Sequence, residues 1–260
     1  MHYYLPNKKD CFPNGWNKIN TYLFLAKCDL PVLKSVLITD IEDLNNLDSI
    51  KNFLDSEICT LRFQYISPSK NPIRGGNAFL IDKETLLPFH DKNRHLWLME
   101  PTNRFTNKYG INIMYRPDSG RILFEIIGSG FDISDINRGD IYPHHVLEFN
   151  IPTDRGYYSN LWYKANVKIV SEEEYVGSII LRKKKLEKMG LSVSNVTFPE
   201  KYTPISLSKL ELIDSYVNIV FEKYGYKREC SITTTILEND RIVFWDIQTP
   251  SDKIMMYTNC

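Results

Sequence analysis

Apolar residues recur at three- and four-residue spacing in four stretches of the chain, and this spacing predicts amphipathic helices. The stretches are Trp16–Lys27, Asp40–Phe53, Glu172–Met189 and Leu207–Tyr224. An Asn-Gly turn precedes the first helix, and an Asp-Leu-Pro sequence ends it. Ser171 stands where its hydroxyl can cap the third helix. The charged run RKKKLEK inside that helix is expected to be a solvated face.

Shorter runs rich in β-branched and aromatic residues predict strands between these helices and after the last one. The strands are Val32–Thr39, Cys59–Tyr65, one beginning at Ala78–Ile81, His95–Glu100, two at the start of Tyr109–Pro143, Val146–Phe149, Glu229–Leu237 and Arg241–Gln248. Ser67–Asn77 and Asp154–Asn160 are expected to be loops, because they are polar and hold few apolar residues. The prediction is an α+β protein with helices before and after a mostly antiparallel central part.

Composition narrows the class of protein without assigning a function. Lys and Arg total 32, as do Asp and Glu, so the formal net charge is zero. This balance gives no reason to expect a nucleic acid or a membrane surface as partner. The five cysteines are scattered and the N-terminus has no basic-then-apolar signal pattern, so we expect a cytoplasmic protein without a disulfide framework.

The stretch Tyr109–Pro143 is the most informative part of the chain. Two apolar-alternating strands flank a Pro-Asp-Ser-Gly turn, and a glycine-punctuated loop follows. Glu125 stands at the start of this glycine-punctuated segment, and Asp132 follows seven residues later. A hairpin alone has no use for acids and glycines at this density. A site that holds magnesium and phosphates beside a strand needs both.

The order of these features resembles the ATP-binding part of phosphoenolpyruvate synthase and pyruvate phosphate dikinase, within the ATP-grasp superfamily. At the N-terminus, GWNKINTYLFLAKCDLPVLKSVLIT resembles that family's glycine-lysine helix, its proline turn and its following strand. LRFQY with RGGN resembles the family's arginine element, and HLWLMEP resembles the linker strand that cups adenine. In the middle, GINIMYRPDSG, FEIIGSGFD and GDIYP follow in the family's order, and WDIQTP stands where the family has its glutamine motif.

The resemblance implies a two-lobed ATP-grasp-like fold with ATP and Mg²⁺ as cofactors. It places a phosphate-contacting lobe at residues 1–95 and an adenine- and metal-binding lobe at residues 96–260. The residues that it implies for the nucleotide are Lys18, Arg62, Arg74, Met99, Glu100, Glu125 and Asp132. Lys18 and Arg62 are also the expected catalytic residues, because phosphoryl transfer depends on cations at the phosphate oxygens. The expected magnesium ligands are Glu125, Asp246 and Gln248.

Each of these residues also has a structural alternative. Lys18 can be a solvated helix lysine, Arg62 part of a salt bridge, and Glu100 the end of a strand. Asp132 can be the N-cap of a short helix, and Arg74 an ordinary loop charge. Glu125 can be an exposed strand residue, and Asp246 and Gln248 can be polar positions on an edge strand. Glycines 128, 130 and 139 can let backbone amides approach a phosphate. Adjacent histidines 144 and 145 suit zinc poorly, because neighbouring strand residues point to opposite faces.

The chain departs from the family at several positions. Ser231–Thr235 offers only hydroxyls where the family has an acidic metal ligand, and Thr249 precedes the proline where the family has arginine. No phosphohistidine or pyruvate-binding segment follows within these 260 residues. The first expectation is therefore a ligase or phosphotransferase. Its acceptor is a small-molecule or peptide carboxylate, or a separate phosphoryl-carrier protein. The alternatives are a nucleotide-binding module without catalysis and an interaction protein of the same fold.

Overall fold

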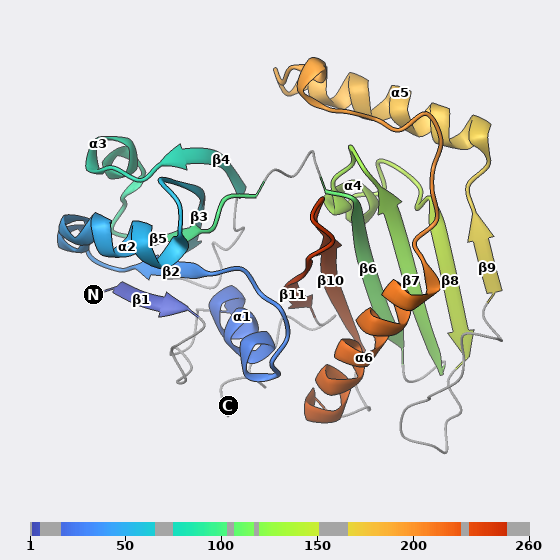
Figure 1. Ribbon diagram of the computed structural model, residues 1–260, viewed down its shortest axis with the longest axis horizontal. Coiled ribbons are helices and arrows are strands. Elements are labelled where there is room, and N and C mark those ends of the chain that lie inside the picture. Colours follow the sequence, from blue (N-terminus) through green and yellow to red (C-terminus); the bar gives the residue numbers. More distant parts are fainter. Residues whose placement is uncertain are drawn as a thin grey trace. The chain divides into compact units, whose positions relative to one another are not determined.

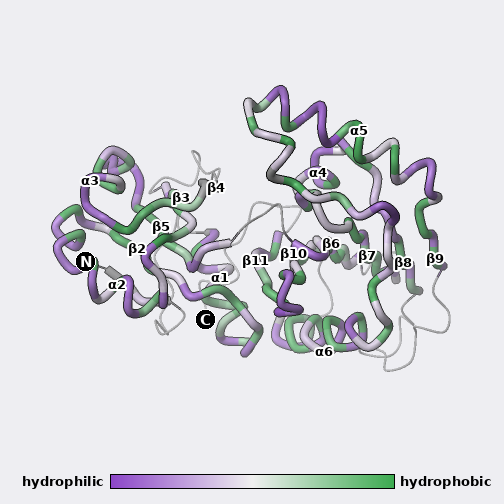
Figure 2. Tube along the Cα trace, turned by 45° about the horizontal axis from the view of Figure 1, so that its top comes forward, coloured by the Kyte–Doolittle hydropathy of each residue, from purple (hydrophilic) through white to green (hydrophobic). Residues whose placement is uncertain are grey.

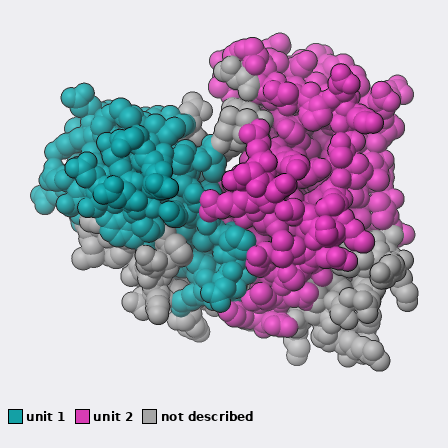
Figure 3. All heavy atoms as spheres, viewed as in Figure 1, with its two compact units in different colours: residues 1–103, 251–260 teal, residues 104–250 magenta. Residues whose placement is uncertain are grey.

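The protein is described by a computed structural model that covers residues 2–5, 17–65, 75–102, 107–116, 120–150, 166–224 and 229–248. Figure 1 shows its elements, and Figure 3 shows its two compact units, which divide between Asn103 and Arg104. Each unit has its own antiparallel sheet. The boundary expected after residue 95 falls inside the strand Arg94–Met99, which pairs on both sides within the first unit.

The first unit contains a five-stranded sheet and several short helices. Its elements are β1 (His2–Leu5), α1 (Asn17–Lys27), β2 (Ser35–Ile38), η1 (Ile41–Asn46), α2 (Leu47–Leu54), β3 (Ile58–Tyr65), β4 (Gly75–Leu80), α3 (Lys83–Leu86), η3 (Leu87–Phe89) and β5 (Arg94–Met99). The strand order is β1-β2-β5-β3-β4, and all neighbours are antiparallel. The predicted helix Asp40–Phe53 is present as two consecutive pieces, η1 and α2.

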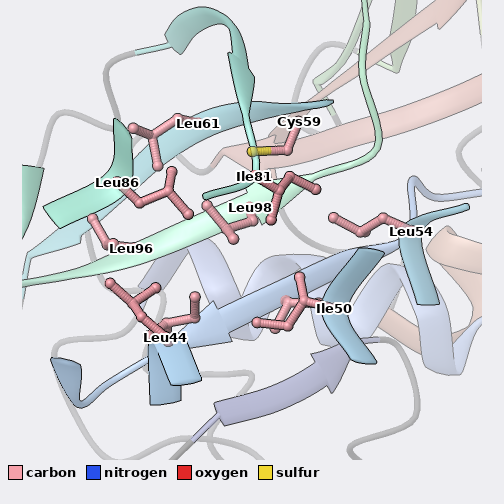
Figure 4. Packing of buried hydrophobic residues seen from close by; sticks show 11 residues of the cluster. Leu44, Ile50, Leu54, Cys59, Leu61, Ile81, Leu86, Leu96 and Leu98 are labelled. Atoms are coloured by element: carbon pink, nitrogen blue, oxygen red, sulfur yellow. The ribbon is translucent and has the colours of Figure 1, made fainter. Parts of the chain in front are cut away.

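The two faces of this sheet have different coverings. One face packs its alternate residues, such as Leu61 and Leu98, against Ile50 and Leu54 of α2, as Figure 4 shows. The residues between them point to the other face. There Trp97 of β5 meets Tyr22 of α1 edge-on, with 5.7 Å between ring centroids. Helix α1 therefore covers the second face.

The second unit contains a six-stranded sheet. Its elements are β6 (Tyr109–Arg116), β7 (Arg121–Gly128), α4 (Ile133–Asn137), β8 (His145–Asn150), β9 (Asn166–Ile169), α5 (Glu172–Lys188), η6 (Val193–Asn195), α6 (Leu207–Tyr224), β10 (Cys230–Ile236) and β11 (Ile242–Gln248). The strand order is β11-β10-β6-β7-β8-β9, again with antiparallel neighbours. The architecture is therefore α+β with antiparallel sheets, as the sequence predicts.

One face of the second sheet is apolar and packs against α6. Tyr115 of β6 lies 4.6 Å from Phe221 of α6 between ring centroids, and Phe244 of β11 lies 5.7 Å from Tyr216. In the ribbon, α6 lies over the strands of this sheet (Figure 1). Burying these large side chains supplies much of the unit's stability, at roughly 1.5–3 kcal/mol for each one fully removed from water.

Helix α5 is attached to the unit by a buried charge network as well as by apolar contacts. Figure 2 shows that much of α5 is hydrophilic. Arg182 is nevertheless only 3% exposed and pairs with the fully buried Asp135 of α4 at 2.9 Å. Lys185 lies 2.6 Å from the same carboxylate. The expectation that RKKKLEK is a solvated face is therefore wrong for these two residues, because a buried acid on another element recruits them.

We expect Asp135→Ala to destabilise the second unit strongly. The substitution leaves the Arg182 guanidinium buried without its carboxylate, and breaking a buried pair in this way typically costs about 3–5 kcal/mol. It also removes the capping-box contact from Asp135 to the backbone amide of Asp132. Urea unfolding followed by circular dichroism measures the loss.

Asp140→Ala is the matched control. Asp140 contacts Lys185 and Arg138 in the same network but is 41% exposed. Exposed pairs contribute about 0.2–1 kcal/mol, so this variant should unfold close to wild type. Equal losses in the two variants would show that burial of Asp135 is not what makes its pairing important.

Candidate functional site

A row of polar residues crosses one face of the second sheet at four neighbouring strands. Asp246 of β11 stands opposite Thr233 of β10, and Thr233 stands opposite Asn112 of β6. Asn112 in turn stands opposite Glu125 of β7. Directly paired residues in a ladder point to the same face. These four side chains therefore project from the face opposite to α6.

A second row lies two residues further along and adds two polar groups. Gln248 of β11 stands opposite Ser231 of β10. Ser231 stands opposite Met114 of β6, and Met114 stands opposite Leu123 of β7. The row between the two polar rows contains Ile232, Ile113 and Phe124, which are fully buried on the α6 side. Strict alternation thus separates a polar face from an apolar one. We call Asp246, Gln248, Ser231, Thr233, Asn112 and Glu125 the polar face.

Hydrogen bonds join the polar face into two groups. Gln248 donates from Nε2 to Oδ2 of Asp246 at 3.0 Å, so these two β11 residues form one group. Asn112 donates from Nδ2 to Oε2 of Glu125 at 3.2 Å. Ser231 donates from Oγ to Oδ1 of Asn112 at 2.5 Å. The second group therefore spans β7, β6 and β10.

Burial raises the pKa of Glu125, while the hydrogen bond from Asn112 and the charge of Arg116 lower it. Burial is the largest of these effects. A carboxylate partly removed from water gains from contact with a cation, because ionisation in a poorly hydrated place needs a compensating charge. Glu125 is thus suited to a cationic or hydrogen-bonding partner.

The three expected magnesium ligands do not form one cluster. Glu125 lies three strands away from Asp246, and three interstrand steps of about 4.8 Å amount to roughly 14 Å. One magnesium ion, with ligand distances of about 2.1 Å, does not reach both carboxylates directly over that span. Among the described residues, no three His, Cys, Asp or Glu side chains come together as a metal site. Asp246 and Gln248 remain together, and Glu125 belongs to the other group.

Lys18 and Arg62 come together in the first unit. Arg62 of β3 stands opposite Trp97, on the sheet face that α1 covers, and Lys18 is on α1. Burial, and to a smaller extent the nearby Arg62 charge, lowers the pKa of Lys18 to about 8. The two side chains therefore place positive charge close together in a partly buried position.

The remaining nucleotide candidates of the first unit have structural surroundings. Met99 is buried in β5 between Ser35 and Thr60. The carboxylate of Glu100 accepts a hydrogen bond from the backbone amide of Lys34 at 2.8 Å, which ties the end of β5 to the chain beside β2. Their contact with adenine or ribose stays a prediction. Arg74 lies outside the described residues.

Asp132 and the glycines around it have structural roles in the second unit. Asp132 caps α4 by accepting a hydrogen bond from the amide of Ser134 at 2.9 Å. A Cβ at Gly128 would lie 3.1 Å from the ring of Tyr202, and one at Gly130 would lie 2.7 Å from Phe198. Gly139 follows α4 with φ of 72°, as residues after helices often do. Packing and turn geometry therefore account for these glycines, and their expected approach to a phosphate is not needed to explain them.

The two adjacent histidines are buried in an aromatic cluster. The His144 ring lies 4.6 Å from that of Phe131, 4.9 Å from Tyr175 and 5.4 Å from Tyr202. Its Nδ1 accepts a hydrogen bond from the amide of Gly128 at 3.2 Å. Burial lowers the pKa of His144 to about 4 and lowers that of His145 as well. The pair is thus part of the core.

The comparison with known proteins found similarity only to solved structures. No family model matches the chain, and no curated protein matches it. D-alanyl-alanine synthetase A from Vibrio cholerae is 10% identical with a TM-score of 0.45, over 91% of this chain and 56% of that one. N5-carboxyaminoimidazole synthase from Aspergillus clavatus, in complex with ADP and its ribonucleotide, is 12% identical with a TM-score of 0.42, over 90% and 44%.

A Chryseobacterium gregarium RiPP-associated ATP-grasp ligase, in complex with ADP and a leader and core peptide, is 7% identical. Its TM-score is 0.41, over 95% of this chain and 56% of that one. The chain spans about half the length of these structures. The finer resemblance to phosphoenolpyruvate synthase stays a prediction. Within the described part of the chain, no helix has the length and apolar character of a membrane span.

Asn112 and Thr233 are polar-face residues that the sequence analysis did not select. Asn112 alternates with Ile111 and Ile113, and it stands as far before the hairpin turn as Glu125 stands after it. That symmetry about the turn could have identified the pair. From the sequence, Thr233 is only one of the hydroxyl residues in Ser231–Thr235. The sequence does not give the order of the strands, so it does not show that Thr233 stands beside Asn112.

We expect the unfolding free energy to fall as the pH falls from about 6.5 towards 4. In that range the unfolded chain protonates His144 while the folded protein does not, so protons favour the unfolded state. The full difference of pKa corresponds to a loss on the order of 3 kcal/mol. Thermal unfolding between pH 7.5 and 4.5 measures it.

His144→Gln should make this pH dependence shallower, because the amide does not titrate and can still accept from Gly128. Phe131→Leu, which changes a non-titrating ring packed against His144, is the control and should keep the wild-type slope. A His144→Gln variant with the wild-type slope would contradict the assignment.

Proposed function

We propose that this protein is an ATP-grasp-like enzyme that transfers the γ-phosphoryl group of ATP to an acceptor. The observation that supports it best is the polar face of the second sheet. There, oxygen ligands of four adjacent strands project from one face while the opposite face is sealed by α6. A sheet that only needed to fold would not place an Asn and a Glu opposite each other on its central strands β6 and β7.

The residues present fit magnesium at one place on the polar face. Asp246 and Gln248 supply a carboxylate and an amide oxygen, two residues apart on β11, and the hydroxyls of Thr233 and Ser231 stand opposite them. Carboxylates, amide carbonyls and waters are the ligands that Mg²⁺ takes in nucleotide sites. When bound, Mg²⁺ would neutralise negative charge on the phosphate oxygens.

Lys18 and Arg62 are proposed to contact the phosphates. Both carry positive charge at neutral pH and lie close enough for the charge of Arg62 to lower the pKa of Lys18, so both can attract phosphate oxygens. Holding cations on phosphate oxygens lowers the barrier to transfer, because charge moves to the bridging oxygen as its bond to the γ-phosphorus breaks. The reaction is then mainly positioning and charge neutralisation by these side chains.

The proposed acceptor is a carboxylate of a small molecule or a peptide. Its oxygen forms a bond to the γ-phosphorus, the bond from that phosphorus to the β,γ-bridging oxygen breaks, and ADP leaves. The acyl phosphate formed would then react with an amine or a thiol and release phosphate. A group on a separate phosphoryl-carrier protein is the alternative acceptor.

Addition of ATP with MgCl₂ should raise the thermal unfolding temperature of the wild-type protein more than ATP with EDTA. Asp246→Ala and Gln248→Ala should remove most of this magnesium-dependent part, because each loses one of the paired oxygen ligands on β11. Lys18→Ala should weaken the stabilisation by ATP itself. Lys27→Ala is the control for the last variant, since Lys27 is an exposed lysine of the same helix.

ADP–ATP exchange and ATP hydrolysis separate an enzyme from a nucleotide-binding module. Glu125→Ala and Gln248→Ala are expected to abolish both activities if the polar face is the site. Variants that hydrolyse ATP like wild type would place the site elsewhere. Magnesium-dependent ATP binding with no exchange or hydrolysis would favour the module, for which the hydroxyls of Ser231–Thr235 are the motivating feature.

Affinity for ATP should fall as the pH rises through about 8. The Lys18 ammonium is the form that attracts phosphate, and in the free protein its pKa is lowered to about 8 by burial and by Arg62. Lys18→Arg should show no such fall up to pH 9.5, because a guanidinium stays charged there. Calorimetric titration with ATP at several pH values measures this, and equal pH profiles for the two proteins would contradict it.

A further inference from the structure

Asn112 has surroundings that backbone structure alone does not require. It is 5% exposed and lies in the middle of β6, although asparagine is depleted in strands. Its strand neighbours Ile111 and Ile113 are fully buried on the α6 side. A buried amide costs free energy unless its hydrogen bonds are made, so an apolar residue would be the simpler occupant of this position.

Both ends of the Asn112 amide are engaged. The Nδ2 atom donates to Oε2 of Glu125 on β7, and the Oδ1 atom accepts from Oγ of Ser231 on β10. The two partners come from strands on opposite sides of β6. The amide therefore fixes the direction in which the Glu125 carboxylate points, and Ser231 fixes the direction of the amide.

We propose that Asn112 is a positioning residue of the candidate site, whose amide holds the Glu125 carboxylate directed along the polar face towards β6. The proposal rests on the proposed function, in which that face receives the nucleotide and its cation. Neither Asn112 nor Ser231 is among the nucleotide-binding or magnesium-binding residues that the resemblance implies.

The charges around Glu125 favour this role for Asn112. Arg116 lies on the same side of β6 as Asn112, and it pairs with Glu229 at 3.4 Å with more than half of its side chain exposed. Lys168 of β9 follows Val146 in the same transverse row, and Asp246 stands at the other end. Among the described residues Glu125 forms no ion pair, and the amide of Asn112 donates a hydrogen bond to its carboxylate.

The first test measures Glu125 directly and does not involve ATP. Protein with ¹³C-labelled glutamate carboxyl groups is titrated by NMR, and the Glu125 resonance is assigned by its absence in Glu125→Gln. Asn112→Leu should move the Glu125 titration to higher pH, because the donor that favours the ionised form is gone. Ser231→Ala should move it less. Met114→Leu, on the same face of the same strand, should leave it unchanged.

The second test measures binding of MgATP by calorimetry. Asn112→Leu should weaken MgATP binding by about tenfold, and Met114→Leu should not. A merely structural Asn112 would lower the unfolding temperature while leaving the Glu125 titration and the MgATP affinity as in wild type. That result would overturn the proposal. If Asn112→Leu does not fold, Asn112→Ser is titrated instead, since it shortens the side chain and removes the amide donor without adding an apolar group.

The outcomes separate the two proposals. Wild-type protein that binds no MgATP, together with a shifted Glu125 titration in Asn112→Leu, would refute the proposed function and leave the positioning of Glu125 standing. Wild-type protein that binds MgATP, together with an unchanged Glu125 titration, would refute the role of Asn112 and leave the proposed function standing.

Discussion

The register of four antiparallel strands, β11-β10-β6-β7, is the constraint on which the second unit and its candidate site depend. It aligns Asp246, Thr233, Asn112 and Glu125 across one face and Ile232, Ile113 and Phe124 on the other. A slip of one residue in any strand would carry its polar groups into the α6 interface and expose its apolar ones. Folding and site assembly are therefore the same event here, because the burial that fixes the register also aligns the oxygen ligands.

The first unit contains Lys18 and Arg62, the two cationic residues of the proposed function. Its sheet buries one face against α2 and leaves the other to α1, from which Lys18 approaches Arg62 of β3. Two cations held close repel each other, whereas the polar face of the second unit offers mostly oxygen atoms. Within each unit, the charged groups are placed by regular elements rather than by loops. Sites built in this way keep their geometry better than loop sites do.

Much of the fold could be predicted from the sequence, since long helices and central strands show their periods clearly. Short or edge elements such as β1 and β9 were not predicted, because a few residues carry too weak a period, and α4 was indicated only as the short helix that Asp132 can cap. The roles of Gly128 and Gly130 depend on rings some seventy residues away, which no local pattern reveals. Likewise, the sequence pattern predicts that Arg182 is a solvated charge, because its pairing with the buried Asp135 is visible only in the structure. The pairing of residues within a hairpin can be inferred from their symmetry about its turn. The order of the hairpins in a sheet cannot be inferred in this way, and that order separates Glu125 from Asp246.

The hydroxyls of β10 change what kind of metal site the polar face can be. A carboxylate attracts Mg²⁺ by its charge, whereas Ser231 and Thr233 offer only neutral oxygens, so Asp246 supplies the full negative charge among these described residues of β10 and β11. Such a set holds a free divalent cation weakly. A cation that already neutralises a triphosphate needs less charge from the protein, and hydroxyls can also donate hydrogen bonds to phosphate oxygens. In the proposed function, the cation therefore binds together with the nucleotide, and Glu125 remains available along the same row for a group other than that ion.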